Sequence, residues 1–176
     1  MALVALLRGV NVGGHRTFRP TVLARQLEHL DIVNIGAAGT FVIRRPVSPA
    51  RLKAELSSRI PFTTQIMIVS GQELLRVAAG NHFASQPEQP GTVRFVSVLS
   101  RIPRAAPAVP INLPSSGQWL LRILGRERRF VFGLYRRHMK AIRYLQTLDR
   151  LYGVPVTTRS LNTIAAIASV LGERAP

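Results

Sequence analysis

Two stretches of the sequence bring together residue types that bind anions. The first is the loop "RGVNVGGHR", which follows an apolar run and contains Arg8, Asn11, Gly13, Gly14, His15 and Arg16. Guanidinium groups bind phosphate through paired donors, and a sharply turning glycine-rich backbone offers N–H groups to the same anion. The loop therefore predicts an anion nest, although a glycine turn with solvated polar side chains explains the same residues equally well.

The loop departs from both standard nucleotide-binding patterns. A Walker loop continues with Lys and Ser or Thr after its last glycine, whereas His15 and Arg16 follow Gly14 here. The dinucleotide-binding pattern also fails, because Asn11 stands where the second glycine belongs. A P-loop ATPase and a Rossmann dinucleotide site are therefore disfavoured.

The second stretch is "TTRSLNT", close to the end of the chain. Arg159 stands just before a predicted helix, and Asn162 and Thr163 fall in its first turn. A helix N-terminus carries unpaired N–H groups and a partial positive charge, so an anion between these three residues would be stabilised. The alternative is ordinary helix capping by Ser160 or Asn162.

The densest positive charge lies in Gln118–Arg150, where nine Lys and Arg residues stand against Glu127 and Asp149. Phe130, Tyr135 and Tyr144 are interspersed among the charges, and basic surfaces with aromatic side chains are typical of nucleic-acid binding. The alternative is that the arginines coat an exposed hairpin and Phe130 belongs to the core. We predict a nucleic-acid-binding surface formed by Arg126, Arg128, Arg129, Arg136, Arg137, Lys140 and Arg143.

The charge of the whole chain agrees with a polyanionic partner. The 176 residues include 24 Lys and Arg against 8 Asp and Glu, a formal net charge of +16. Such an excess attracts polyanions over a distance. Biased codon use explains a preference for arginine over lysine, but it does not explain the shortage of acids.

Other chemistries find little support in the sequence. The chain has no cysteine, and His15, His29, His82 and His138 do not form a ligand pair at helical spacing. There is no nucleophile-elbow motif and no convincing carboxylate pair. We therefore predict no metal and no cofactor, and we assign no catalytic residue. No apolar run approaches the ~20 residues of a membrane span, so we expect a cytoplasmic protein with no membrane partner.

Strand and helix signals alternate along residues 1–100. The order is an apolar strand at Ala2–Leu7, a helix at Pro20–Leu30, strands at Ile32–Ile35 and Thr40–Arg44, a helix after Ser48-Pro49, and a strand at Thr64–Val69. This β-α-β-β-α-β order predicts an α+β protein with a ferredoxin-like, or split βαβ, N-terminal part. Ser70 and Glu73 form a capping box before a further helix, and Thr92–Leu99 is a further strand.

The rest of the chain predicts a linker and a smaller α+β part. Four prolines in residues 101–117 favour a stiff, extended linker. In residues 118–176 we expect a basic β-hairpin and two helices, the second around Asn162–Leu171. The first helix, Met139–Tyr152, is expected to turn Met139, Ile142, Leu145 and Leu148 inward.

The opening "ALLRGVNVGG" resembles the start of a widespread bacterial family of uncharacterised proteins. Members open with ALLRG, a branched residue and NVGG, and they close with an RNWNT-like motif that Arg159, Asn162 and Thr163 match. Ser160 and Leu161 depart from that closing motif. The resemblance implies a ferredoxin-like N-terminal part and a smaller α+β C-terminal part, and it implies no activity.

The sequence is compatible with three classes of function. The leading one is a non-enzymatic protein that binds nucleic acid or another phosphate-bearing anion through its arginine-rich surface. The second is a small-molecule enzyme with an anion pocket between the Gly9–Gly14 loop and the Arg159–Thr163 helix start. The third is a self-associating structural protein.

Overall fold

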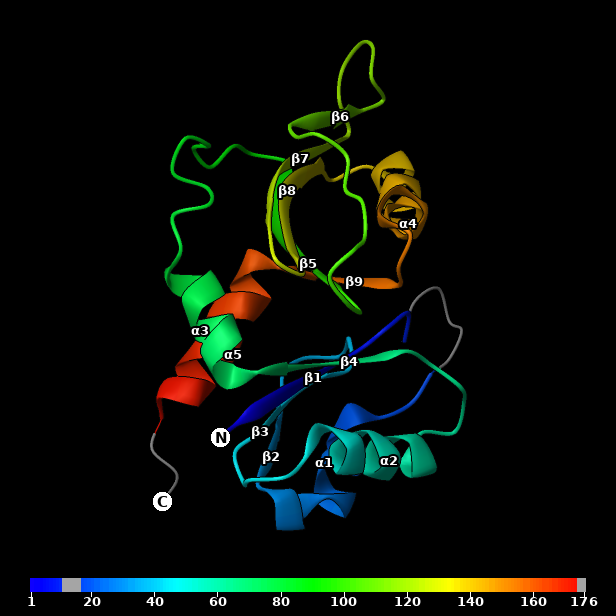
Figure 1. Cartoon of the computed structure of the whole chain (residues 1–176), viewed down its shortest axis with the longest axis vertical. Coiled ribbons are helices and arrows are strands. Elements are labelled where there is room, and N and C mark those ends of the chain that lie inside the picture. The colour runs from blue at the N-terminus through cyan, green and yellow to red at the C-terminus, as the bar shows by residue number, and fades with distance from the viewer. Residues whose placement is uncertain (11–16, 174–176) are drawn as a thin grey trace. The chain divides into compact units, whose positions relative to one another are not determined.

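The computed structural model describes residues 1–10 and 17–173, which form two compact units (Figure 1). The first unit contains Met1–Ala79 together with the chain from Asn162 onward. The second unit contains Gly80–Leu161. Each unit is built on its own antiparallel sheet.

The sheet of the first unit has four strands in the order β2-β3-β1-β4, and all neighbours are antiparallel. The central strand pairs Val4 with Val42 on one side and with Val69 on the other. The strands are β1 (Leu3–Leu7), β2 (Ile32–Asn34), β3 (Thr40–Ile43) and β4 (Ile66–Ser70). Every residue of β1 is buried, as expected for a continuous apolar strand at the centre of a sheet.

Helices α1 (Pro20–Gln26) and α2 (Pro49–Arg59) and the short 3-10 helix η1 (Glu28–Leu30) accompany this sheet. Leu27 and Leu52 from the helices share one core cluster with Phe41 from the sheet. Proline occupies the first turn of both helices, and the Ser48 hydroxyl accepts a hydrogen bond from Arg51 N at 3.2 Å. The succession of strands and helices through β4 is the one that the sequence predicts.

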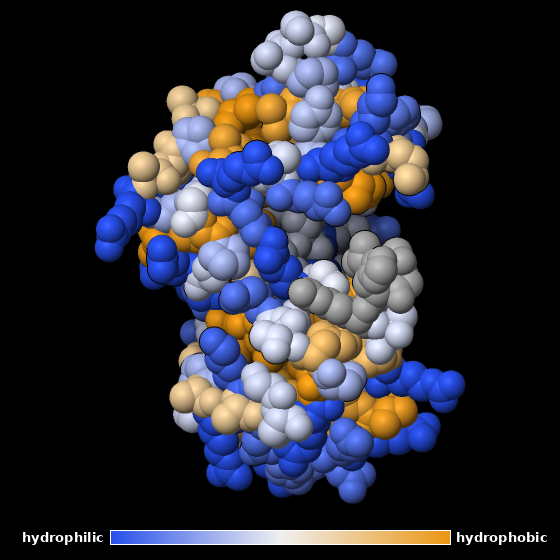
Figure 2. Space-filling view, turned by 90° about the vertical axis from the view of Figure 1, so that its right-hand side faces the viewer, coloured by the Kyte–Doolittle hydropathy of each residue, from blue (hydrophilic) through white to orange (hydrophobic). Residues whose placement is uncertain are grey.

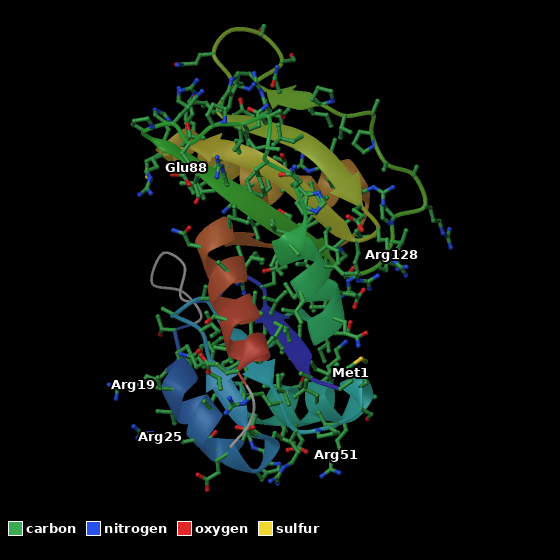
Figure 3. All side chains as sticks on the ribbon, turned by 90° about the vertical axis from the view of Figure 1, so that its left-hand side faces the viewer. Met1, Arg19, Arg25, Arg51, Glu88 and Arg128 are labelled. Carbon is green, nitrogen blue, oxygen red and sulfur yellow. The ribbon has the colours of Figure 1, made fainter. Side chains whose placement is uncertain are left out.

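Two further helices belong to the first unit, α3 (Gly71–Ala79) and α5 (Leu161–Gly172, counted from Asn162). The predicted capping box is present, since Glu73 N donates to Ser70 Oγ at 3.2 Å and Ser70 N donates to the Glu73 carboxylate at 3.0 Å. Figures 1 and 3 show α3 and α5 side by side. They approach closely at Gly71, where an added Cβ would lie 2.8 Å from Leu171 Cδ2.

The sheet of the second unit has five strands in the order β6-β7-β8-β5-β9, again antiparallel throughout. The strands are β5 (Thr92–Leu99), β6 (Ile111–Leu113), β7 (Leu121–Glu127), β8 (Phe130–Arg136) and β9 (Val156–Ser160). Helix α4 (Met139–Tyr152) covers one face of this sheet (Figure 1). Leu148 and Tyr152 of the helix share a core cluster with Phe95, Ile123 and Val131 of the strands.

The boundaries differ from those that the sequence suggested, which were 1–100, 101–117 and 118–176. Strand Thr92–Leu99 pairs with β8 and β9, so it belongs to the second sheet. The proline-rich residues 101–117 lie inside the second unit, where β6 pairs with β7. The final helix belongs to the first unit. Sheet membership depends on pairing between distant segments, and the local pattern of one strand does not encode it.

The buried face of α4 also differs from the predicted one. Leu148 is buried and Leu145 packs against the core, as predicted, but Met139 is 85% exposed and Ile142 is 42% exposed. Ala141 and Tyr152 are buried in their place. Both arrangements satisfy a helical period, and the small side chain of Ala141 gives little signal of burial in the sequence.

Among the described residues, no helix is both long enough and apolar enough to span a membrane.

Candidate functional site

Six of the seven residues of the predicted basic surface form two groups at opposite ends of the β7–β8 hairpin, and the seventh, Arg143, lies on α4. Strand pairing places Glu127 opposite Phe130 beside the turn and Leu121 opposite Tyr135 at the other end. The seven residues of β8 span about 20 Å at ~3.3 Å per residue. Figure 3 labels Arg128 at the turn and Glu88 at the far end of the sheet. The tip group is Arg126, Arg128 and Arg129; the base group is Arg136, Arg137 and Lys140.

Trp119 holds two arginines at the base of the hairpin. The guanidinium carbons of Arg122 and Arg136 lie 4.6 Å and 4.4 Å from the centroid of the indole ring. Arg136 Nε also donates to the Trp119 carbonyl at 2.9 Å, and Arg122 Nε donates to Asn112 Oδ1 at 2.8 Å. Cation–π contacts and these hydrogen bonds fix both side chains, so the indole is already engaged within the protein.

The outer face of α4 connects the two ends. Lys140, Arg143 and Arg150 are exposed on this helix, and the structure gives them no carboxylate partner among residues 1–10 and 17–173. The fourteen residues of α4 extend about 20 Å at ~1.5 Å per residue. Figure 2, seen from the α4 side of the second unit, shows strongly hydrophilic residues beside hydrophobic ones on this surface. The helix therefore displays a row of cations beside exposed Met139.

Three segments of the second unit meet at the tip of the hairpin. Leu99 N at the end of β5 donates to the Arg129 carbonyl at 2.8 Å, and Ser100 N donates to the Pro155 carbonyl at 2.9 Å. The hairpin turn, the chain that follows β5 and the start of β9 are therefore tied together. Arg128 occupies the left-handed region, with φ of 52°, in the turn that forms this tip.

A cavity of about 500 Å³ lies at the same end of the unit. Arg101 and Arg104 enter it from the chain after β5, and Arg150 enters it from the last turn of α4. The remaining lining residues are Ala105, Leu151, Tyr152, Gly153 and Val154, so the lining residues include three arginines and no acid. Reasoning from the sequence missed Arg101 and Arg104, because it assigned them to a linker.

The three carboxylates of the second unit are not among the lining residues of this cavity, and each is engaged with another group. The unit contains 13 Lys and Arg residues and 3 acids, a net charge of +10. Asp149 Oδ1 accepts from Val156 N at 3.0 Å, Glu127 lies 3.7 Å from His82 Nε2, and Glu88 lies 3.3 Å from Arg94 Nη1. No ion pair neutralises Arg101, Arg104 or Arg150 within the described part of the chain.

The predicted anion nest lies largely outside the described residues, because Asn11, Gly13, Gly14, His15 and Arg16 fall in residues 11–16. Arg8 is half-buried, and its backbone N donates to the Gln65 carbonyl at 3.0 Å. The Thr64 hydroxyl donates to the Arg8 carbonyl at 2.6 Å. These hydrogen bonds anchor the chain just before the loop.

Arg159 lies in strand β9, two residues before the start of helix α5. Strand β9 continues to Ser160, and α5 begins at the next residue, with Asn162 exposed and Thr163 half-buried in its first turn. Arg159 is only 6% exposed, and Nη1 donates to Thr157 Oγ1 and to the Thr158 carbonyl, each at 2.8 Å. Burial lowers the pKa of Arg159 to about 10, so the group stays charged at neutral pH.

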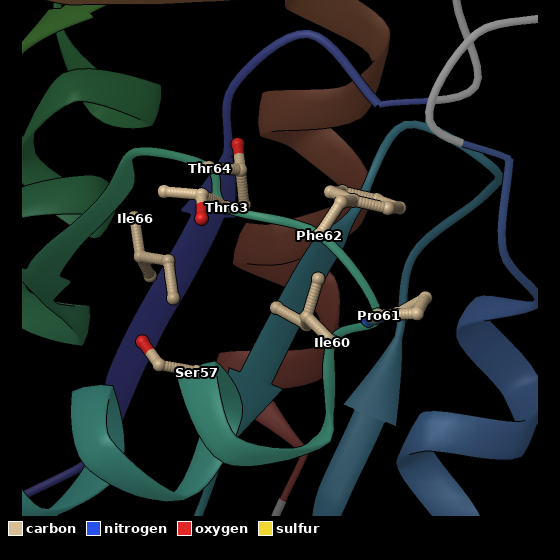
Figure 4. A pocket seen from close by; sticks show the side chains of 7 residues that line it. All are labelled: Ser57, Ile60, Pro61, Phe62, Thr63, Thr64 and Ile66. Carbon is tan, nitrogen blue, oxygen red and sulfur yellow. The ribbon is translucent and has the colours of Figure 1, made fainter.

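The first unit contains a smaller cavity of about 330 Å³ that carries no charge (Figure 4). Ser57, Ile60 and Phe62 line it together with Pro61, Thr63, Thr64 and Ile66. The Phe62 and Phe18 rings pack nearly perpendicular to each other, with the ring centroids 5.8 Å apart. Within the described part of the chain, no group of three His, Cys, Asp or Glu residues is arranged to hold a metal ion.

The mixed α+β fold of this chain, with its two antiparallel sheets, has a similar solved structure. It is similar to "the structure of conserved bacterial protein SP0830 from Streptococcus pneumoniae", with a TM-score of 0.60 and 13% sequence identity over 97% of this chain and 98% of that chain. At this identity the likeness concerns the fold alone. The chain belongs to the family of proteins of unknown function DUF1697, whose model matches residues 1–126. No curated protein matches the chain.

Proposed function

We propose that the second unit binds nucleic acid through the phosphate backbone, along the outer face of α4 and the basic group at each end of it. The observation that carries the proposal is the exposed row Lys140, Arg143 and Arg150, which has no carboxylate partner among the described residues. Cations that are already neutralised by the protein do not release counterions from a nucleic acid, whereas this row is available to do so.

The aromatic residues argue against recognition by base stacking. Phe130 is 3% exposed, and Trp119 is in contact with two guanidinium groups. Base stacking needs an accessible ring face. The proposal is therefore backbone binding with little preference for sequence, rather than readout of base edges.

A salt series with fluorescent oligonucleotides tests the proposal. We expect the affinity for single-stranded DNA and RNA to fall steeply with salt, with a slope of about −0.7 per phosphate neutralised in a plot of log affinity against log salt. The variant K140Q/R143Q should reduce the steepness by about 0.7 for each phosphate that it leaves without a cation. Binding that does not depend on salt, or no binding at low salt, would contradict the proposal.

A matched control comes from the first unit. Arg19 and Arg25 are exposed cations at the two ends of α1, and Figure 3 labels both. The variant R19Q/R25Q removes the same charge as K140Q/R143Q, but from a surface outside the proposed site. It should therefore retain most of the affinity for oligonucleotides. Equal losses of affinity in the two variants would show a general attraction to net charge and not a surface on α4.

We also propose that the first unit follows the ferredoxin-like plan. Its support is the strand order β2-β3-β1-β4 with antiparallel neighbours, combined with the β-α-β-β-α-β order along the chain. A crystal structure of the protein that showed a different strand order would overturn this assignment.

A further inference from the structure

We infer that the cavity lined by Arg101, Arg104 and Arg150 binds a phosphate monoester group. The group is either the phosphorylated end of a nucleic-acid strand or a free phosphorylated small molecule. If the phosphate belongs to the end of a nucleic-acid strand, the inference rests on the proposed function. If it belongs to a small molecule, the inference is independent of that function. It assigns a site to arginines that lie outside the surface predicted from the sequence.

The backbone that presents the three arginines is fixed. Pro103, between Arg101 and Arg104, is buried although its neighbours are exposed. The preceding residue, Ser100, donates its backbone N–H to the Pro155 carbonyl at 2.9 Å. Preorganised cations lose less conformational entropy when they bind a ligand than cations on a free loop do.

The other wall of the cavity is equally well anchored. Tyr152 is 3% exposed and packs in the core of the second unit, and Gly153 ends α4 in the left-handed conformation with φ of 65°. Arg150 lies in the last turn of this helix. Because Leu151 and Val154 add apolar surface to the lining, charges at the cavity interact more strongly with an anion than they would in open water.

The charge and the size of the cavity favour a monoester over a diester. A phosphate monoester carries a charge of about −1.5 to −2 at neutral pH and has three acceptor oxygens. Three guanidinium groups match such a group, since each offers paired donors. A volume of about 500 Å³ lies within the usual range for small-ligand sites, so a mononucleotide is of suitable size.

The experiment compares one oligonucleotide sequence with a 5′-phosphate, with a 3′-phosphate and with hydroxyls at both ends, in parallel with a mononucleotide and inorganic phosphate. We expect one phosphorylated end to bind about tenfold more tightly than the hydroxyl form. R101Q/R104Q should abolish this preference. R101K/R104K keeps the positive charge but removes the paired donors, so this variant should retain only part of the preference for the phosphorylated end. R19Q/R25Q should leave the preference unchanged.

The pH dependence gives a second readout. The second pKa of a phosphate monoester is about 6, so the preference for the phosphorylated end should decrease as the pH falls below that value. Thermal unfolding of each variant checks that the exposed substitutions leave the fold intact.

The outcomes separate this inference from the proposed function. Equal binding of phosphorylated and hydroxyl ends, with a salt dependence that K140Q/R143Q reduces, would overturn the inference and leave the proposed function in place. Binding of mononucleotide that R101Q/R104Q abolishes, without binding of any oligonucleotide, would reject the proposed function and support a small-molecule ligand. If none of the phosphorylated probes bound, the inference would be wrong.

Discussion

Phe95 on β5 lies opposite Gly133 on β8, and the phenyl ring occupies the space that a side chain at Gly133 would need. A Cβ added to Gly133 would lie 2.5 Å from Phe95 Cζ and 2.5 Å from the Arg122 carbonyl oxygen. The ring is fully buried and the carbonyl belongs to the neighbouring strand, so neither group moves easily. Glycine is therefore required at the centre of this sheet by close packing.

We expect Gly133→Ala to destabilise the protein by about 1–3 kcal/mol, the usual range for overpacking a core. Gly125→Ala is the matched control, because Gly125 lies on the adjacent strand β7 and a Cβ there would meet no atom within 4 Å. Urea unfolding followed by circular dichroism measures both variants. Equal midpoints for the two substitutions would contradict the packing argument.

Trp119 is the single tryptophan of the chain, so its fluorescence reports on the two arginines that contact it. We expect Arg136→Ala to shift the emission maximum, because it removes both the cation–π contact and the hydrogen bond to the Trp119 carbonyl. The loss of the cation–π contact should cost about 0.5–1 kcal/mol. Arg137→Ala removes the same charge one residue away, and the emission should stay unchanged.

Truncation of a side chain should have a large effect on stability on the buried side of α4 and almost none on its exposed side. Leu148 is fully buried, so Leu148→Ala should cost about 2–5 kcal/mol of stability. Met139 is 85% exposed, so Met139→Ala should change the stability by no more than about 0.5 kcal/mol. Thermal unfolding measures the stability of both variants. A large loss of stability from Met139→Ala would indicate that Met139 is buried, as the sequence predicts.

Tyr152 gives a prediction that depends on pH. Its hydroxyl is buried and has no hydrogen-bond partner among the described residues. Burial raises the pKa of Tyr152 above its usual value of 10.0, although the charge of Arg126 opposes the shift. Tyr152→Phe should therefore be neutral or slightly stabilising at pH 7, since it removes an unsatisfied polar group.

The same residue should weaken the wild-type protein at high pH. The unfolded chain releases the Tyr152 proton near pH 10.0, while the folded protein retains it, so stability decreases as the pH rises above this value. Denaturant unfolding of wild type and Tyr152→Phe at increasing pH should show a widening difference in favour of the variant. A constant difference would contradict the buried environment of the hydroxyl.

The sequence predicts local structure well in this protein because the signals are themselves local. Pro20, Pro49 and the pair Ser70 and Glu73 mark helix starts through contacts within one turn, and each helix begins where they indicate. The partner of a strand is not a local property. Thr92–Leu99 reads as one more strand of the first part, yet its neighbours β8 and β9 come 31 or more residues later along the chain.

The candidate site was only partly predictable for the same reason. The exposed cations Lys140 and Arg143 follow from the charge pattern of one helix. The cavity instead lies between segments that are far apart in the sequence, and the hydrogen bond from Ser100 to Pro155 joins the chain after β5 to the start of β9. Arg101 and Arg104 stand among prolines in the sequence, and nothing there indicates that Arg150 lines the same cavity.

The chain leaves the first unit after Ala79 and returns to it at Asn162, so the second unit is an insertion within a discontinuous host. Truncation from the C-terminus would deprive the host of α5 while leaving the insertion complete. The host can be obtained alone only by excising Gly80–Leu161 and rejoining the cut ends, whereas the insertion can be expressed as one uninterrupted gene fragment.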